Sequence, residues 1–167
     1  MNTMEKATRL LEEFARSRGL ENLVFGEDGD CSLVDEEERV IHLQVDAEND
    51  CIICLAALGA LPSPAGCRPE MLYDLLAANF CWQRSLGATL ATEPQSGQVI
   101  IQRNLSLADV DADALSSFID AFTQVTVYWE GRLAEMQAAS EDDESPFSAA
   151  EDDAAEDDAE AESMLRV

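Results

Sequence analysis

The first stretch of the chain shows a helical spacing of apolar and polar positions. Between Thr3 and Arg18, apolar side chains recur at three- and four-residue steps, and charged side chains occupy the other faces. This pattern predicts an amphipathic helix. Gly19 favours a stop directly after it, and Thr3 is a residue type that can cap its start. The apolar positions of this helix are Ala7, Leu10, Leu11, Phe14 and Ala15.

Three strands are predicted next. Cys31–Val34 is short and follows a segment rich in Gly and Asp, which is typical of a turn. Arg39–Val45 alternates between apolar and other side chains, as a half-buried strand does. Cys51–Leu58 is apolar on both faces, which predicts a strand covered from both sides. Polar turns at 35–38 and 47–50 separate the three segments, so we expect a meander of antiparallel hairpins.

A loop, a short helix and a hairpin are predicted in the second half of the chain. Pro and Gly residues mark 59–68 as a loop. Pro69 suits the first turn of a helix, and the apolar pattern ends that helix near Asn79. Strands follow at Gly87–Thr92 and Gln98–Arg103, joined by a polar hairpin loop.

A long apolar stripe predicts the final helix. The helix starts near Asp111 or Asp113, and its apolar side chains recur at helical steps as far as Met136. The element order is therefore α-β-β-β-α-β-β-α. Antiparallel strands with helices segregated to one side predict an α+β domain. The stripe consists of Leu115, Phe118, Ile119, Phe122, Val125, Trp129, Leu133 and Met136.

The charge balance narrows the range of partners. The chain has 167 residues, which suits one domain, and it has 35 acidic against 10 basic residues, a net charge of -25. Nucleic acid and anionic membrane are unexpected partners, because their phosphate-rich surfaces would be repelled. Basic or amphipathic polypeptides are favoured instead.

The acidic residues are concentrated at the C-terminal end. Residues 138–167 contain 12 acidic residues and one basic residue, with Ala as the commonest spacer. Self-repulsion and poor burial predict a disordered acidic tail beyond a folded domain at 1–137. Such a run is most often a solvated charge brush. An alternative is that the tail occupies the protein's own binding groove until a client arrives.

The chain shows no signal for export or membrane insertion. Its start lacks a basic region followed by an apolar stretch. Its longest apolar run, 51–61, is about half of the ~20 residues that span a bilayer. Five Cys residues, an odd number, indicate free thiols in a reducing compartment. We therefore expect a cytoplasmic protein.

Candidate chemical motifs are weak. Cys51 and Cys54 have the spacing of a redox or zinc pair, but a strand places side chains at odd separation on opposite faces. His42 is the only His, and no nucleophile motif accompanies it. Asp28-Gly29-Asp30 lacks the later ligands of a calcium loop. We expect no catalytic residue, metal site or cofactor, and therefore not an enzyme.

Apolar side chains around the second helix are more numerous than a core of this size requires. They suggest a homodimer surface, because exposed apolar patches usually mark contact sites. The alternative, that all of them are core, is left open, and the same question applies to the first helix and the strand after it. The residues around the second helix are Met71, Leu72, Leu75, Leu76, Phe80 and Trp82.

Several local phrases in this order resemble the class I chaperones of bacterial type III secretion, the Tir chaperone family. They are the acidic hairpin Leu33–Val40, the strand end Leu58–Pro62, the phrase Leu75–Asn79 (Leu-Leu-Ala-Ala-Asn), the hairpin with Gly87, and Leu105–Leu107 before the final helix. The Leu-Leu-Ala-Ala-Asn phrase is the most specific. The resemblance covers roughly residues 3–136, so the acidic tail lies outside it.

The resemblance implies a homodimer that binds the N-terminal segment of a secreted effector in extended form. Such a chaperone protects this segment and delivers it to the type III export apparatus in the bacterial cytoplasm, without ATP hydrolysis. An alternative is a regulatory or adaptor protein of the same fold without a secreted client. The implied client-binding residues are Leu11, Phe14, Phe25, Val34 and Val40. The implied dimer residues are Leu72, Leu75, Leu76 and Leu90.

Overall fold

The computed structural model describes residues 2–35, 37–61 and 69–141. It confirms the α+β class and the expected order of helices and strands, with one short 3₁₀ helix added after the second helix. Five antiparallel strands form one sheet in the order β1-β2-β3-β5-β4. The elements are α1 (Thr3–Arg18), β1 (Asp30–Val34), β2 (Val40–Asp46), β3 (Cys51–Ala60), α2 (Pro69–Ala78), η1 (Phe80–Trp82), β4 (Thr89–Thr92), β5 (Gln98–Ser106) and α3 (Ala112–Glu141).

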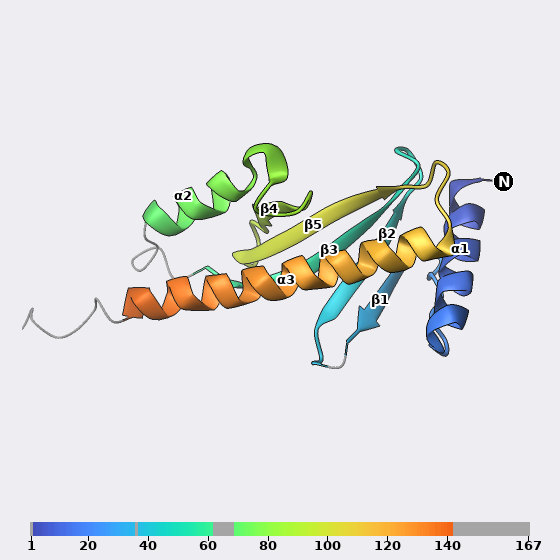
Figure 1. The fold of residues 1–167 in the computed structure, drawn as a ribbon, viewed down its shortest axis with the longest axis horizontal. Coiled ribbons are helices and arrows are strands. Elements are labelled where there is room, and N and C mark those ends of the chain that lie inside the picture. The colour runs from blue at the N-terminus through green and yellow to red at the C-terminus, as the bar shows by residue number, and fades with distance from the viewer. Residues whose placement is uncertain (1, 36, 62–68, 142–167) are drawn as a thin grey trace, which may run out of the picture.

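The three helices occupy different parts of the sheet (Figure 1). The long helix α3 runs along one face. Helix α1 crosses the end of the sheet where α3 begins, and α2 lies toward the opposite end, beside β4. None of the helices in the described ranges has the length and apolar content needed to cross a membrane. The arrangement leaves α1 and α2 far apart, with α3 spanning the distance between them.

Both ends of α1 are fixed by local hydrogen bonds. The prediction that Thr3 caps the helix is wrong, because the N-cap is Asn2. The Asn2 side chain accepts a hydrogen bond from the backbone N–H of Glu5 at 2.8 Å, and the Glu5 carboxylate accepts one from the backbone N–H of Asn2 at 3.0 Å. This reciprocal pair is a capping box. Gly19 ends the helix as expected, in the left-handed conformation at φ 66°.

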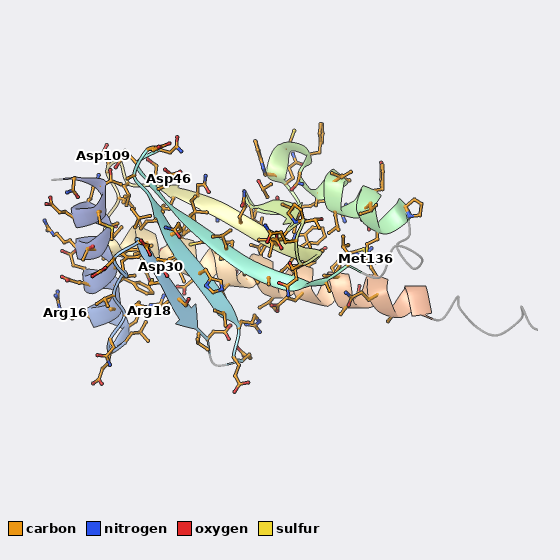
Figure 2. All side chains as sticks on the ribbon, turned by 180° about the vertical axis from the view of Figure 1, so that it is seen from behind. Arg16, Arg18, Asp30, Asp46, Asp109 and Met136 are labelled. Carbon is orange, nitrogen blue, oxygen red and sulfur yellow. The ribbon has the colours of Figure 1, made fainter. Side chains whose placement is uncertain are left out.

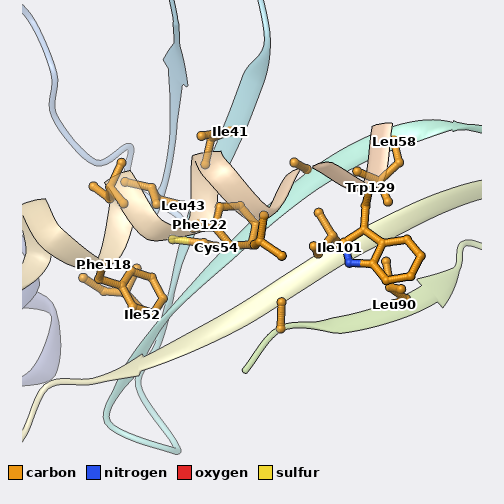
Figure 3. Packing of buried hydrophobic residues seen from close by; sticks show 14 of the residues in the cluster. Ile41, Leu43, Ile52, Cys54, Leu58, Leu90, Ile101, Phe118, Phe122 and Trp129 are labelled. Carbon is orange, nitrogen blue, oxygen red and sulfur yellow. The ribbon is translucent and has the colours of Figure 1, made fainter. Parts of the chain in front are cut away.

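The core lies between α3 and the facing side of the sheet (Figure 3). Phe122 and Trp129 of α3 are fully buried against Ile52 of β3 and Ile101 of β5. Burying one such side chain contributes roughly 1.5–3 kcal/mol relative to exposure. The predicted apolar stripe of α3 is thus the core face of the helix. The Nε1 atom of Trp129 is buried without a hydrogen-bond partner among the described residues.

On the face of the sheet away from α3, the side chains of the third strand are less buried than expected. Ile53 and Leu55 of β3 are only half-buried and Ala57 is exposed, so this strand is not covered from both sides. Figure 2 views the molecule from this side and shows no described helix across the sheet. The reason is that α2 packs beside the edge strand β4 instead of over the centre of the sheet.

Three segments are longer than expected. Strand β5 continues to Ser106, past the predicted end at Arg103. Strand β3 continues through Gly59 to Ala60, past the predicted start of the loop, with a β-bulge between Ala57 and Gly59. Helix α3 continues to Glu141, past the predicted domain end at 137. The rest of the predicted loop, 62–68, and of the predicted disordered tail, 142–167, lies outside the described residues.

Candidate functional site: a groove and an apolar face

A groove of about 570 Å³ opens where α1, the β1–β2 hairpin and α3 meet. This volume is typical of ligand sites in proteins. Residues from α1 and its C-terminal end form one wall, the hairpin forms the other, and α3 forms the floor. The lining residues are Phe14, Arg18, Leu20, Leu33, Val34, Asp35, Ile41, Ile119, Asp120, Thr123 and Gln124.

The lining of the groove is mostly apolar, with charged side chains at Arg18, Asp35 and Asp120. Phe14, Ile41 and Ile119 are buried at the base, where they belong to the core. Leu20 and Val34 are exposed on the two walls. An extended apolar chain could therefore bury its side chains here without displacing the core.

An arginine from the α1 wall binds α3. The Arg18 guanidinium donates hydrogen bonds to the Asp120 carboxylate and to the Ser116 hydroxyl. The same group lies 5.8 Å from the centre of the Phe14 ring, which is within the range of a cation–π contact. Arg18 therefore fixes the distance between α1 and α3 at this end of the groove.

A second arginine binds α3 from the hairpin wall. The Arg39 guanidinium donates through Nε to the Glu130 carboxylate at 2.8 Å and through Nη1 to the Asp35 carboxylate. Desolvation raises the pKa of Asp35, but hydrogen bonds from the Arg39 and Glu37 amides and the charge of Arg39 outweigh it. The net result is a pKa of Asp35 below its ordinary value. Asp35 is therefore held ionised at neutral pH.

The five residues expected to bind a client lie in different surroundings. Phe14 and Val34 line the groove. Leu11 is fully buried in the core and Phe25 is half-buried against it. Val40 is exposed, beside Val34 in the β1–β2 register, and does not line the groove. The structure thus brings two of the five together at this site.

Residues of α3 form the part of the groove that sequence reasoning missed. Ile119 belongs to the predicted apolar stripe of this helix, and Thr123 lies one turn further along the same side. The sequence of a helix does not show which distant segment packs against its side. The contact between α3 and the hairpin joins positions about 90 residues apart, as between Arg39 and Glu130.

The four expected dimer residues separate into exposed and buried pairs. Leu72 and Leu76 of α2 are 42% and 72% exposed, whereas Leu75 and Leu90 are buried. We define the exposed large apolar side chains of α2 and the segment after it as the α2 face. Its members are Leu72, Tyr73, Leu76, Phe80, Trp82 and Leu86.

Among the described thiols, Cys51 and Cys54 are buried and Cys31 is half-buried, whereas Cys81 is exposed between Phe80 and Trp82 of the α2 face. Cys54 faces the core and Cys51 the other side of β3, as an odd separation requires. Burial raises the pKa of both thiols, and it raises that of Cys31 to about 11. His42 is exposed on β2, with Nδ1 2.9 Å from the Ser32 hydroxyl. Within the described ranges, no cluster of three or more His, Cys, Asp or Glu is arranged to hold a metal.

Solved structures with a similar fold include a chaperone–effector complex and a type III secretion chaperone. A chain of the ExsC–ExsE complex matches with a TM-score of 0.69 and 22% identity, covering 80% of this chain and 97% of that one. A chain of the HopA1–SchA chaperone–effector complex matches with a TM-score of 0.65 and 18% identity, covering 77% and 95%. The structure of the Yersinia pestis type III secretion chaperone SycH with a fragment of YscM2 matches with a TM-score of 0.58 and 24% identity, covering 72% and 97%.

The fold is therefore one that type III secretion chaperones use. The sequence itself decides the family: the model of the Tir chaperone protein (CesT) family matches residues 9–130. The chain belongs to this family, as the resemblance predicted. No protein with a curated description matches the chain.

Proposed function

We propose that the protein is a type III secretion chaperone that binds the N-terminal segment of a secreted effector in the groove. The observation that supports this most directly is an open apolar groove in a Tir chaperone fold, with Phe14 and Val34 in its lining. The segment would be protected there and presented to the export apparatus. The chain would act by binding alone, in the bacterial cytoplasm, without catalysis, ATP hydrolysis or a cofactor.

The edge of the sheet offers a second element of client binding. Strand β1 is an edge strand, paired only with β2 in the described sheet. An extended peptide can add to such an edge through backbone hydrogen bonds, while adjacent pockets accept alternate side chains. Leu33 and Val34 of β1 line the groove, so an added strand would deliver its side chains directly beside it.

We also propose that the α2 face is the surface of a homodimer. Its six large apolar side chains are exposed on one short segment of the chain, and a soluble monomer rarely leaves a contiguous patch of this kind uncovered. Leu72 and Leu76 would contact the second copy directly. Leu75 and Leu90, which are buried, would support the surface from beneath.

The proposal that the groove binds a client is tested by co-purification with candidate clients. These are secreted proteins encoded beside the gene of this chain. We expect one to form a stable complex through its N-terminal segment. Val34→Asp should weaken that complex about tenfold, since it places a charge in the apolar groove. The matched control is Val24→Asp, because Val24 is 59% exposed, Val34 is 65% exposed, and Val24 lies outside the groove lining.

Two outcomes would contradict the proposal. If both variants bind a client as the wild type does, the groove is not the binding site. If the stable partner is a protein that is never secreted, the function is that of a regulator or adaptor with the same fold.

A further inference from the structure

The turn between β1 and β2 is organised around one carboxylate. Oδ1 of Asp35 accepts hydrogen bonds from the backbone N–H groups of Glu37 at 3.0 Å and Arg39 at 2.8 Å. The backbone N–H of Asp35 donates to the carbonyl of Arg39 at 3.1 Å. These bonds tie Asp35 to Glu37 and Arg39, and Asp35 and Val34 belong to the lining of the groove.

Arg39 connects this turn to α3. Its side chain is 20% exposed, and two of its carboxylate partners, Asp35 and Glu130, are 20% and 28% exposed. The third, Glu37 at 3.5 Å, is 67% exposed. Arg39 is not among the residues that line the groove. One guanidinium thus binds the turn on one side and the helix on the other, from behind the wall and not from within the groove.

The two arginine contacts reach α3 at separate points. Arg18 binds Asp120 and Arg39 binds Glu130, and both carboxylates belong to α3. Ten positions of an α-helix span about 15 Å. Thr123 and Gln124 of the floor lie between these two points. The α3 residues that line the groove run only from Ile119 to Gln124, which is about 7.5 Å of helix.

We propose that Arg39 is a positioning residue for client binding: it holds the hairpin wall against α3 and so keeps the groove in the shape that accepts a client. This inference rests on the proposed function of the groove. Arg39 acts through Asp35 and Glu130 and does not touch the client. A lysine could not replace it fully, because an ammonium lacks the planar fork that bridges two carboxylates.

The experiment compares Arg39→Met, Arg39→Lys and Glu130→Gln with the wild-type full chain. The matched control is Arg9→Met, which removes an exposed Arg–Glu pair on α1 outside the groove. Hydrogen exchange of the amides of 33–41 reports the hairpin in the free protein. Fluorescence anisotropy with a labelled six-residue peptide of alternating leucine and serine reports the groove, and thermal melting reports the global fold.

In Arg39→Met we expect faster exchange confined to the hairpin and binding about tenfold weaker, with a melting temperature close to that of the wild type. Arg39→Lys should recover part of the affinity, because it retains the charge, and Glu130→Gln should resemble Arg39→Met in direction. Arg9→Met should change neither readout.

The outcomes separate the two proposals. Unchanged hairpin exchange in Arg39→Met overturns the positioning role, as does peptide affinity equal to that of the wild type. A third result would also overturn the positioning role. In it, the affinity falls only in proportion to the melting temperature, and Arg39→Lys recovers none of it. Arg39 would then have a purely structural role. If the wild-type chain does not bind the peptide, the result contradicts the proposed groove function itself and any role of Arg39 in it.

Discussion

Asn79 shows how a single side chain joins two elements. Its Oδ1 accepts a hydrogen bond from the backbone N–H of Leu90 at 2.9 Å, and its Nδ2 donates to the carbonyl of Leu90 at 3.0 Å. The amide thus pairs with both backbone groups of one residue in the edge strand β4, as a neighbouring strand would. This contact gives a physical reason for the Asn at the end of the Leu-Leu-Ala-Ala-Asn phrase.

Asn79→Ala should lower the free energy of unfolding by about 1–3 kcal/mol, because it leaves the Leu90 N–H and carbonyl without their partner. Asn104→Ala is the control, since Asn104 is exposed on β5. Urea denaturation followed by circular dichroism measures both. Equal stability of the two variants would show that water replaces the amide at no cost.

At the scale of elements, the α2 face makes a prediction about assembly. Leu72→Asp should convert a dimer to a monomer at micromolar concentration, because a carboxylate in an apolar interface loses its hydration without a partner. Val127→Asp is a matched control on α3, since both side chains are 42% exposed. Sedimentation velocity distinguishes the two states. A wild-type chain that sediments as a monomer would refute the proposed dimer.

The elements also show what the sequence could predict. The periodic stripes of α1 and α3 predicted both helices, because a core-facing helix must repeat its apolar side chains at helical steps. The cap at Asn2 was missed, since Asn2 and Thr3 both have side chains that can cap and only the bond to Glu5 distinguishes them. The α3 side of the groove was missed for a different reason: it depends on packing between segments distant in the sequence, and no local pattern encodes that.

At the scale of the whole molecule, the net charge of -25 is the dominant feature. Like charges repel most when the protein is compact, so the charge opposes folding at low ionic strength. Salt screens this repulsion, with a Debye length of about 30 Å at 0.01 M and about 8 Å at 0.15 M. Among the described residues, three ion pairs join segments that are distant in sequence: Arg18–Asp120, Arg39–Glu130 and Arg132–Asp74.

Raising NaCl from about 0.01 M to about 0.5 M should therefore increase the melting temperature by roughly 2–4 °C, which corresponds to about 1 kcal/mol for a chain of this size. Differential scanning fluorimetry measures this shift. A chain truncated after residue 141 should show a smaller increase, because residues 142–167 contribute 11 of the 35 acidic residues. A melting temperature that falls with salt would mean that the ion pairs outweigh the repulsion.

The chain has two tryptophans, and they occupy opposite environments. Trp129 is fully buried, with the Arg84 guanidinium 5.7 Å from the centre of its ring, whereas Trp82 is exposed on the α2 face. Their emission should therefore separate, with Trp129 fluorescing at shorter wavelength and Trp82 at longer wavelength and open to quenching by iodide. Burial of Trp82 in a second copy would remove that quenching. The protein thus contains its own optical reporter of assembly, which needs no attached dye.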